Sequence, residues 1–267
     1  MTPERLSGIE GALLGLASGD RVGGPTRMAL RVAESLAENG AFDPDDIFGR
    51  YFIWWDTEGF DCGPTVNAVF QLVSSGTPRQ AACIEVDRRV GGMTAGCNPA
   101  HRSVALALLG SLPDSLLGHA ARAEAELTHV HPLAGDVAAA TVRVCRALIA
   151  GRSWPEALSW GKEDRLPETQ HAFDEVSQSD LSRSGYAPDV FGAALWFVGN
   201  SQSLDEALRR SIQFAGPSNY CPVLVGSIGG ARWGVEANAK EWYAHHDARY
   251  LNRIRTVARA LGTSVGG

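Results

Sequence analysis

Prolines at four expected helix starts constrain the fold of this chain more than any other feature of its sequence. They are Pro25, Pro64, Pro99 and Pro222, and a run of helix-compatible residues follows each one. Proline is tolerated in the first turn of a helix because the N–H group that it lacks would have no partner there. Helix N-termini carry unpaired N–H groups and partial positive charge. If the four ends converge, they form an anion site that needs no metal ion.

Helix start and stop signals recur along the chain, whereas alternating strand patterns are nearly absent and none is bounded by hairpin turns. Asp43 and Pro44 begin one helix, and Gly40 ends the one before it. The segment 161–185 is polar and irregular, which is typical of a loop. Helices are expected over 8–18, 28–36, 64–75, 78–90, 99–110, 113–126, 132–150, 154–163, 188–199, 203–214, 222–233 and 246–261. The pattern predicts a single all-α domain spanning residues 1–267.

Composition excludes several classes of protein. The net charge is −6 and the lysines and arginines form no cluster along the chain, so the basic patch of a nucleic-acid-binding protein is not expected. No apolar run approaches the roughly 18 residues that a membrane-spanning helix needs. The first ten residues lack the cationic-then-apolar pattern of a secretory leader. Five cysteines without framework spacing suggest reduced thiols. A cytoplasmic protein is therefore expected.

Six segments, taken in order, give the chain a family resemblance over nearly its whole length. Together they resemble landmarks of the ADP-ribosylglycohydrolases, beginning with the opening helix of that family. The segments are Gly11–Asp20 (GALLGLASGD), Met28–Leu36 (MALRVAESL), Phe60–Thr65 (FDCGPT), Gly96–Arg102 (GCNPAHR), Leu127–Asp136 (LTHVHPLAGD) and Gly226–Gly234 (GSIGGARWG).

This resemblance implies an all-α domain with a central cleft, where two Mg²⁺ ions help to hydrolyse the glycosidic bond of an ADP-ribosyl group. Both acidic motifs that hold those metals in the family are missing here. The segment 21–27 is short and keeps only Thr26 as a remnant of the first motif. The segment 216–220 reads Gly-Pro-Ser-Asn-Tyr where the second motif would carry two aspartates. We therefore expect no metal ligands and no cofactor.

Two residues are candidates for catalysis because they stand at family positions. Asp61 lies where the family has an aspartate near the metals, so it could act as a general base or accept a ribose hydroxyl. Its alternative is a helix cap or a buried acid that hydrogen-bonds to the backbone. His129 matches the family histidine that faces the ligand, although a lone histidine is more often structural.

The same resemblance assigns ligand contacts to two loops. In the first loop these contacts fall to Gly63 and Thr65, and in the second to Cys97 and Asn98. Asn98 could also cap the helix that begins at Pro99. Arg102, one turn further on, could pair with a phosphate, although a salt-bridged or solvated arginine is the commoner outcome.

The former metal corner carries Asn219, Tyr220 and Cys221, which are assigned to the ligand as well. Tyr220 could stack on a base, donate to a ribose oxygen or simply fill space. Cys221 is the cysteine best placed for a lowered pKa at a helix N-terminus. The alternatives are a small buried hydrophobe, and a zinc site with Cys62, Cys97 and His129 that no CxxC spacing supports.

Two functions follow, and the oligomeric state stays open. The preferred one is hydrolysis of a ribosyl glycosidic bond in an ADP-ribose-like or nucleotide substrate without the usual metal pair, because Asp61, Asn98 and His129 keep their family positions. The alternative is an inactive relative that only binds an ADP-ribose-like small molecule. Less favoured is a metabolic enzyme that uses a cysteine or Tyr220. Neither a nucleic acid nor a membrane is an expected partner.

Overall fold

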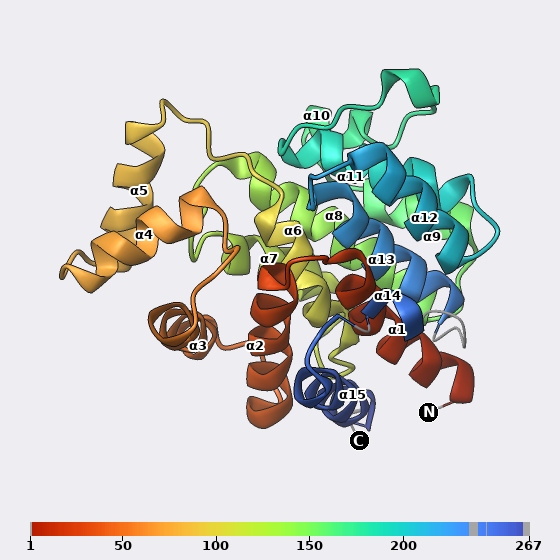
Figure 1. Cartoon of the computed structure of the whole chain (residues 1–267), viewed down its shortest axis with the longest axis horizontal. Coiled ribbons are helices and arrows are strands. Elements are labelled where there is room, and N and C mark those ends of the chain that lie inside the picture. Colours follow the sequence, from red (N-terminus) through yellow and green to blue (C-terminus); the bar gives the residue numbers. More distant parts are fainter. Residues whose placement is uncertain (1, 235–239, 244, 264–267) are drawn as a thin grey trace.

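The computed structural model describes residues 2–234, 240–243 and 245–263. Every regular element in these ranges is a helix, which confirms the predicted all-α fold class (Figure 1). Strand-like pairing in the same ranges is limited to an isolated antiparallel bridge between Gly96 and Tyr186. That bridge brings the irregular segment before α11 against the loop before α6.

The helices follow one another with short connections. Their bounds are α1 (Pro3–Gly19), α2 (Gly24–Asn39), α3 (Pro44–Thr57), α4 (Pro64–Ser74), α5 (Arg79–Arg89), α6 (Asn98–Arg102), the 3₁₀ helix η1 (Ser103–Leu108), α7 (Asp114–Ala125), α8 (Pro132–Ile149), α9 (Trp154–Lys162), α10 (Pro167–His171), the 3₁₀ helix η2 (Gln178–Asp180), α11 (Ala187–Gly199), α12 (Leu204–Ala215), α13 (Tyr220–Trp233), α14 (Lys240–Tyr243) and α15 (Ala248–Thr263).

The four helix starts marked by prolines agree with these bounds, whereas α1 and α2 begin several residues before the expected ranges 8–18 and 28–36. Pro64 is the first residue of α4, Pro25 and Pro99 are the second residues of α2 and α6, and Pro222 is the third residue of α13. All four prolines therefore lie in a first turn, where the missing N–H group costs no hydrogen bond.

One expected helix is divided. The range 99–110 forms α6 and then tightens into η1 from Ser103 onward. Arg146 on α8 donates from Nη2 to the carbonyl oxygens of Leu106 and Leu109. These carbonyl oxygens accept from the Arg146 guanidinium instead of from backbone N–H groups of a longer α-helix. A local sequence pattern does not show this long-range contact.

The core is centred on α1 and α13, which pack against each other more extensively than any other pair of described helices. Their backbones touch directly, because a Cβ atom built on Gly15 would lie 2.1 Å from the Gly226 carbonyl oxygen. A Cβ built on Gly226 would lie 1.9 Å from the Gly15 carbonyl oxygen. This contact brings the C-terminal end of α1, at Asp20, beside the N-terminal end of α13, at Asn219.

The remaining helices surround this pair. In Figure 1, α4 and α5 extend to one side of the body, and α9 to α12 lie on the other. Within the described residues, each helix is too short or too polar to span a bilayer. All five cysteines are buried and free.

Candidate functional site

The first turns of four helices line one cavity of about 360 Å³, which we call the helix-end pocket. Pro25 comes from α2, Pro64 from α4, Asn98 from α6 and Tyr220 from α13. The condition posed by the sequence, that the four proline-headed helix starts converge, is therefore met in the structure. Of the predicted site residues, Asp61, Gly63, Thr65, Cys97, Asn98, His129, Asn219 and Tyr220 line this pocket, whereas Arg102 and Cys221 do not.

Asp61 is the acid of the helix-end pocket. It connects α3 to α4 with a φ angle of 49°, in the left-handed region that aspartate and asparagine tolerate better than most residues. The pKa of this carboxyl group is raised to about 6, chiefly by desolvation and also by the nearby charge of Asp20, against the opposing effect of the Gly24 N–H group. Asp61 can therefore exchange a proton near neutral pH.

Both histidines that line the pocket are neutral. Burial lowers the pKa of His101 to about 4, and its Nε2 lies 2.9 Å from the Tyr220 carbonyl oxygen. Burial also lowers the pKa of His129 well below its usual value, and the charge of Arg102 adds to this effect. With neutral histidines and no lining lysine or arginine, the partial positive charge that the lining residues offer a ligand comes from the helix ends.

Asp20 lies beside the helix-end pocket and was not among the predicted site residues. It is fully buried, and its carboxylate accepts hydrogen bonds from the Gly23 and Thr26 backbone N–H groups at 2.8 Å each. The Thr26 hydroxyl donates to it at 2.6 Å and the Asn219 amide at 2.7 Å. Asp20 thus fixes the start of α2 and ties it to the loop before α13.

These residues do not fit the pair of Mg²⁺ ions that the resemblance implies. Each Asp20 oxygen already accepts at least two hydrogen bonds from N–H or O–H groups, so the lone pairs that would ligate a cation are already engaged. The Asn219 side-chain oxygen accepts from the Arg21 N–H group at 3.0 Å, so it is also engaged. Across the ranges that the structure describes, no three histidine, cysteine, aspartate or glutamate side chains are grouped to hold a metal.

Asn98 is held in a single orientation within the pocket wall. Its side-chain N–H₂ group donates to the Cys62 carbonyl oxygen at 3.1 Å, and its oxygen accepts from Arg102 Nη1 at 2.8 Å. Arg102 lies behind this wall with no exposed surface, and its Nε is 2.6 Å from the Glu124 carboxylate. The predicted contact of Arg102 with a ligand phosphate is therefore corrected, because Glu124 pairs with the guanidinium and burial hides it.

His129 stands between two cavities. Its Nδ1 lies 2.8 Å from the Thr128 hydroxyl, and a Cβ built on Gly96 would lie 3.6 Å from its Nε2. It lines the helix-end pocket and also a second cavity of about 300 Å³.

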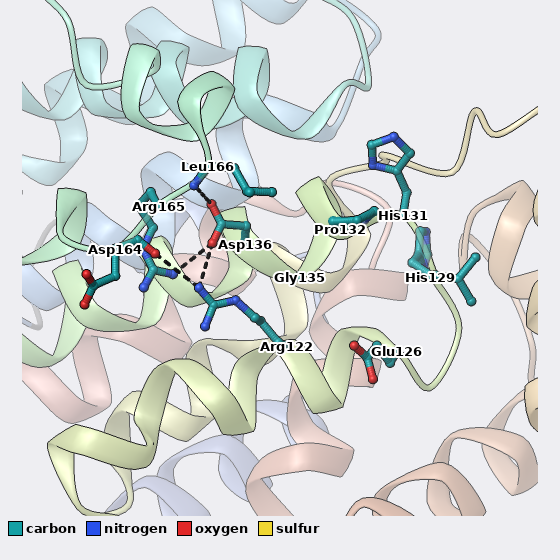
Figure 2. Close-up of a pocket in the computed structure, with 11 residues that line it drawn as sticks. Arg122, Glu126, His129, His131, Pro132, Gly135, Asp136, Asp164, Arg165 and Leu166 are labelled. Atoms are coloured by element: carbon teal, nitrogen blue, oxygen red, sulfur yellow. Dashed lines mark hydrogen bonds and ion pairs between the residues drawn. The ribbon is translucent and has the colours of Figure 1, made fainter.

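The second cavity, shown in Figure 2, contains a structural ion pair. Asp136 Oδ1 accepts from Arg122 at 2.9 Å and from Arg165 at 3.2 Å. Asp136 Oδ2 accepts from the Leu166 N–H group at 2.8 Å. Asp136 therefore ties α8 to the loop before α10, and both of its carboxylate oxygens already have hydrogen-bond donors.

Burial favours the interpretation of the cysteines as small buried hydrophobes. Desolvation raises the pKa of Cys97 to about 12 and also raises that of Cys221. Cys221 lies buried in the first turn of α13 and does not line the helix-end pocket, which corrects its assignment as a ligand contact. Both thiols therefore remain protonated at neutral pH, which argues against the alternative of a nucleophilic Cys221.

We expect native protein at pH 8 to react slowly with a chromogenic disulfide reagent, because every cysteine is buried and a protonated thiol is a poor nucleophile. All five thiols should react at once in denaturant. Absorbance of the released chromophore over time checks this. A fast single-thiol phase in the folded protein would contradict the expectation.

The rim of the pocket combines the predicted residue Tyr220 with two that sequence reasoning missed, Met93 and Gly185. Tyr220 is 43% exposed, and its ring lies against Gly185 of the irregular segment. Met93, at 80% exposure, lines the opening as well. Gly185 reaches the site because its carbonyl oxygen accepts from the Cys97 N–H group at 3.1 Å. No local sequence pattern predicts this long-range hydrogen bond.

Comparison with known proteins gives consistent results. The sequence profile described as ADP-ribosylglycohydrolase matches residues 1–264. The chain is 27% identical to the ADP-ribosyl-[dinitrogen reductase] glycohydrolase of Rhodospirillum rubrum, over 88% of this chain and 77% of that protein. It is 24% identical to the ADP-ribosylarginine hydrolase Tri1 of Pseudomonas putida (strain GB-1), over 98% of this chain and 80% of that protein.

A solved structure is similar in fold. It is titled as an ADP-ribosylglycohydrolase-related protein complex and superposes with a TM-score of 0.75 at 23% identity. The match covers 99% of this chain and 100% of that one.

Proposed function

This chain belongs to the ADP-ribosylglycohydrolase family, and from that premise we propose that it hydrolyses the glycosidic bond of an ADP-ribosyl group without a metal pair. The observation that carries the proposal is the position of Asp61. Its carboxyl group, with a pKa of about 6, lines a pocket whose walls are the N-termini of four helices. An acid that exchanges protons near neutral pH is thus combined with a region that favours phosphate.

The helix ends would bind the diphosphate. At the start of α4, the backbone N–H groups of Thr65 and Val66 have no partner among the described residues. Such groups donate to phosphate oxygens at helix N-termini. A pocket of about 360 Å³ holds part of an ADP-ribosyl group, and its open side would admit the remainder.

Asp61 would act on water at the ribose. Its ionised carboxylate accepts a proton from a water molecule as the water oxygen bonds to the anomeric carbon. The bond from that carbon to the leaving group breaks, and the leaving group departs with the electron pair and takes up a proton. A nearby carboxylate also stabilises the oxocarbenium-like transition state. Asn98 and His129 would contact the ribose.

The proposal is tested with an ADP-ribosylated arginine, the linkage named for the Tri1 relative. Release of ADP-ribose is followed by chromatography, with free NAD and an ADP-ribosylated serine as parallel substrates. Release that exceeds a protein-free control supports hydrolysis. No release from any of the three overturns it.

Loss of catalysis with retained binding is the second candidate function. It is favoured by one observation: Asn219 stands where the family resemblance expects an aspartate, and it hydrogen-bonds to Asp20. Thermal stabilisation by ADP-ribose without any turnover would support this candidate. Ligand at about 100 times its dissociation constant should add about 2.7 kcal/mol to the free energy of unfolding.

Chelation distinguishes the metal-free proposal from the ordinary family mechanism. We expect EDTA to leave both turnover and melting temperature unchanged, because the Asp20 oxygens are already held by hydrogen-bond donors. Added Mg²⁺ should likewise have no effect on melting. Differential scanning fluorimetry and the release assay measure the two quantities. A Mg²⁺-dependent rise in either one would contradict the metal-free site.

A further inference from the structure

A chain of hydrogen bonds runs from a buried ion pair to the wall of the helix-end pocket. Arg102 Nη2 donates to Thr128 Oγ1 at 2.9 Å, and Thr128 Oγ1 lies 2.8 Å from His129 Nδ1. All three residues are almost completely buried, with 0%, 1% and 3% exposure. Water therefore cannot replace any of these bonds.

The direction of the second bond follows from the first. A guanidinium only donates, so Thr128 Oγ1 accepts from Arg102. The Thr128 hydroxyl hydrogen then needs an acceptor of its own, and His129 Nδ1 is the one that lies within reach among the described residues. If Nδ1 carried the proton instead, the threonine would keep a buried donor with no partner, which is costly. Nδ1 is therefore the acceptor, and the ring proton is on Nε2.

We infer that Arg102, acting through Thr128, is a positioning residue that fixes His129 as an Nε2–H donor facing the helix-end pocket. The Nε2–H group then donates to an acceptor oxygen of the bound ligand, such as a ribose hydroxyl or a phosphate oxygen, and His129 is not a base. The tautomer is a property of the free protein. The ligand contact rests on the function proposed above.

The same guanidinium also orients a second pocket residue. Arg102 Nη1 donates to the Asn98 side-chain oxygen, which places the Asn98 N–H₂ group on the Cys62 carbonyl oxygen. Glu124 fixes the guanidinium in turn, through Nε at 2.6 Å. The Tyr51 hydroxyl donates to the same carboxylate at 2.7 Å. The Arg102 guanidinium thus determines which side-chain atoms of His129 and Asn98 act as hydrogen-bond donors.

The experiment changes Thr128, because replacing Arg102 would leave the buried Glu124 carboxylate unpaired and endanger folding. Thr128→Val keeps the shape of the side chain and removes the hydroxyl. Thr128→Ser keeps the hydroxyl and serves as the conservative rescue. Thr141→Val is the matched control, since Thr141 is equally buried but donates to the Val137 carbonyl oxygen within α8.

The readout is the tautomer of His129, measured by long-range ¹H–¹⁵N correlation in full-length protein labelled with ¹⁵N-histidine. His129→Gln identifies the signals by their loss. We expect the Nε2–H pattern in the unmodified protein, in Thr128→Ser and in Thr141→Val, and a mixture of tautomers in Thr128→Val. Binding of ADP-ribose, measured by calorimetry, should weaken about 5-fold in Thr128→Val, which matches the net value of one hydrogen bond.

Each outcome decides the inference. An Nδ1–H or doubly protonated His129 in the unmodified protein overturns it, as does an unchanged tautomer in Thr128→Val or a failed rescue by Thr128→Ser. The expected tautomers with unchanged ADP-ribose affinity in Thr128→Val support the positioning and overturn the ligand contact. The expected tautomers with no ADP-ribose binding by any form support the positioning while contradicting the proposed function.

Discussion

Replacing Asp61 with asparagine should lower turnover of an ADP-ribosylated substrate by about 10²- to 10⁴-fold, the usual contribution of a general base. Asparagine cannot accept the proton from water, yet it has the size of aspartate and tolerates the same positive φ angle. Binding of ADP-ribose should persist, because backbone N–H groups are the proposed phosphate ligands. Rates from the release assay and affinities from calorimetry separate the two effects.

The raised pKa of Asp61 also predicts how activity and stability change with pH. Since the pKa of Asp61 is raised to about 6, the base is ionised above that pH, and kcat/KM should rise through pH 6 in the unmodified protein. A raised carboxyl pKa means that the folded state binds the proton more tightly than the unfolded chain. Ionisation of Asp61 therefore lowers stability as the pH rises from about 4 to 6. Asp61→Asn should consequently melt higher than the unmodified protein at pH 7.5 but not at pH 4.

Asp56→Asn is the matched control for this prediction, because Asp56 is an exposed aspartate in the last turn of α3. It should change neither turnover nor the pH profile. Full activity in Asp61→Asn would remove Asp61 from the mechanism.

Replacing Gly226 with alanine should lower the free energy of unfolding by about 3 kcal/mol or more, at the upper end of the overpacking range. The new methyl group would lie 1.9 Å from the Gly15 carbonyl oxygen, which belongs to backbone and cannot turn aside. The helices α1 and α13 would have to separate. For a chain of this size, we expect the melting temperature to fall by about 6–12 °C, measured by circular dichroism.

Gly49→Ala provides the control for that substitution. Gly49 lies within α3, and a Cβ atom there would meet nothing within 4 Å. Alanine has the higher helix propensity, so this change should raise stability by about 0.5–1 kcal/mol. Similar melting temperatures for Gly226→Ala and Gly49→Ala would show that the α1–α13 contact is looser than described.

The fold class and most helix bounds could be predicted from the sequence because their signals are local. Pro64 begins a helix and Gly40 ends one, and each acts through its own φ angle and hydrogen-bonding capacity. The sequence alone did not show whether the four helix starts converge. This depends on how α1 and α13 pack, which lies beyond any local window.

The site residues show the same division between local and tertiary causes. Asp61 lies in the loop that precedes α4 and Asn98 is the first residue of α6, so both line the pocket at these helix starts. Arg102 was assigned to a ligand because its partner Glu124 is 22 positions away, and charge pairing over that distance leaves no pattern. The alternative of a lowered pKa at Cys221 fails because desolvation, which a sequence does not display, raises that pKa more than a helix N-terminus lowers it.

The N–H groups at the start of α4 belong to the main chain, so any residue except proline supplies them. Alanine scanning of the helix-end pocket would pass over these donors and report only side chains such as Asp61 and Asn98. Thr65→Pro or Val66→Pro deletes one donor at a time, and proline is tolerated in a first turn. The proposed anion binding thus depends on the path of the backbone, so substitutions at nearly every side chain of the pocket would leave these donors in place.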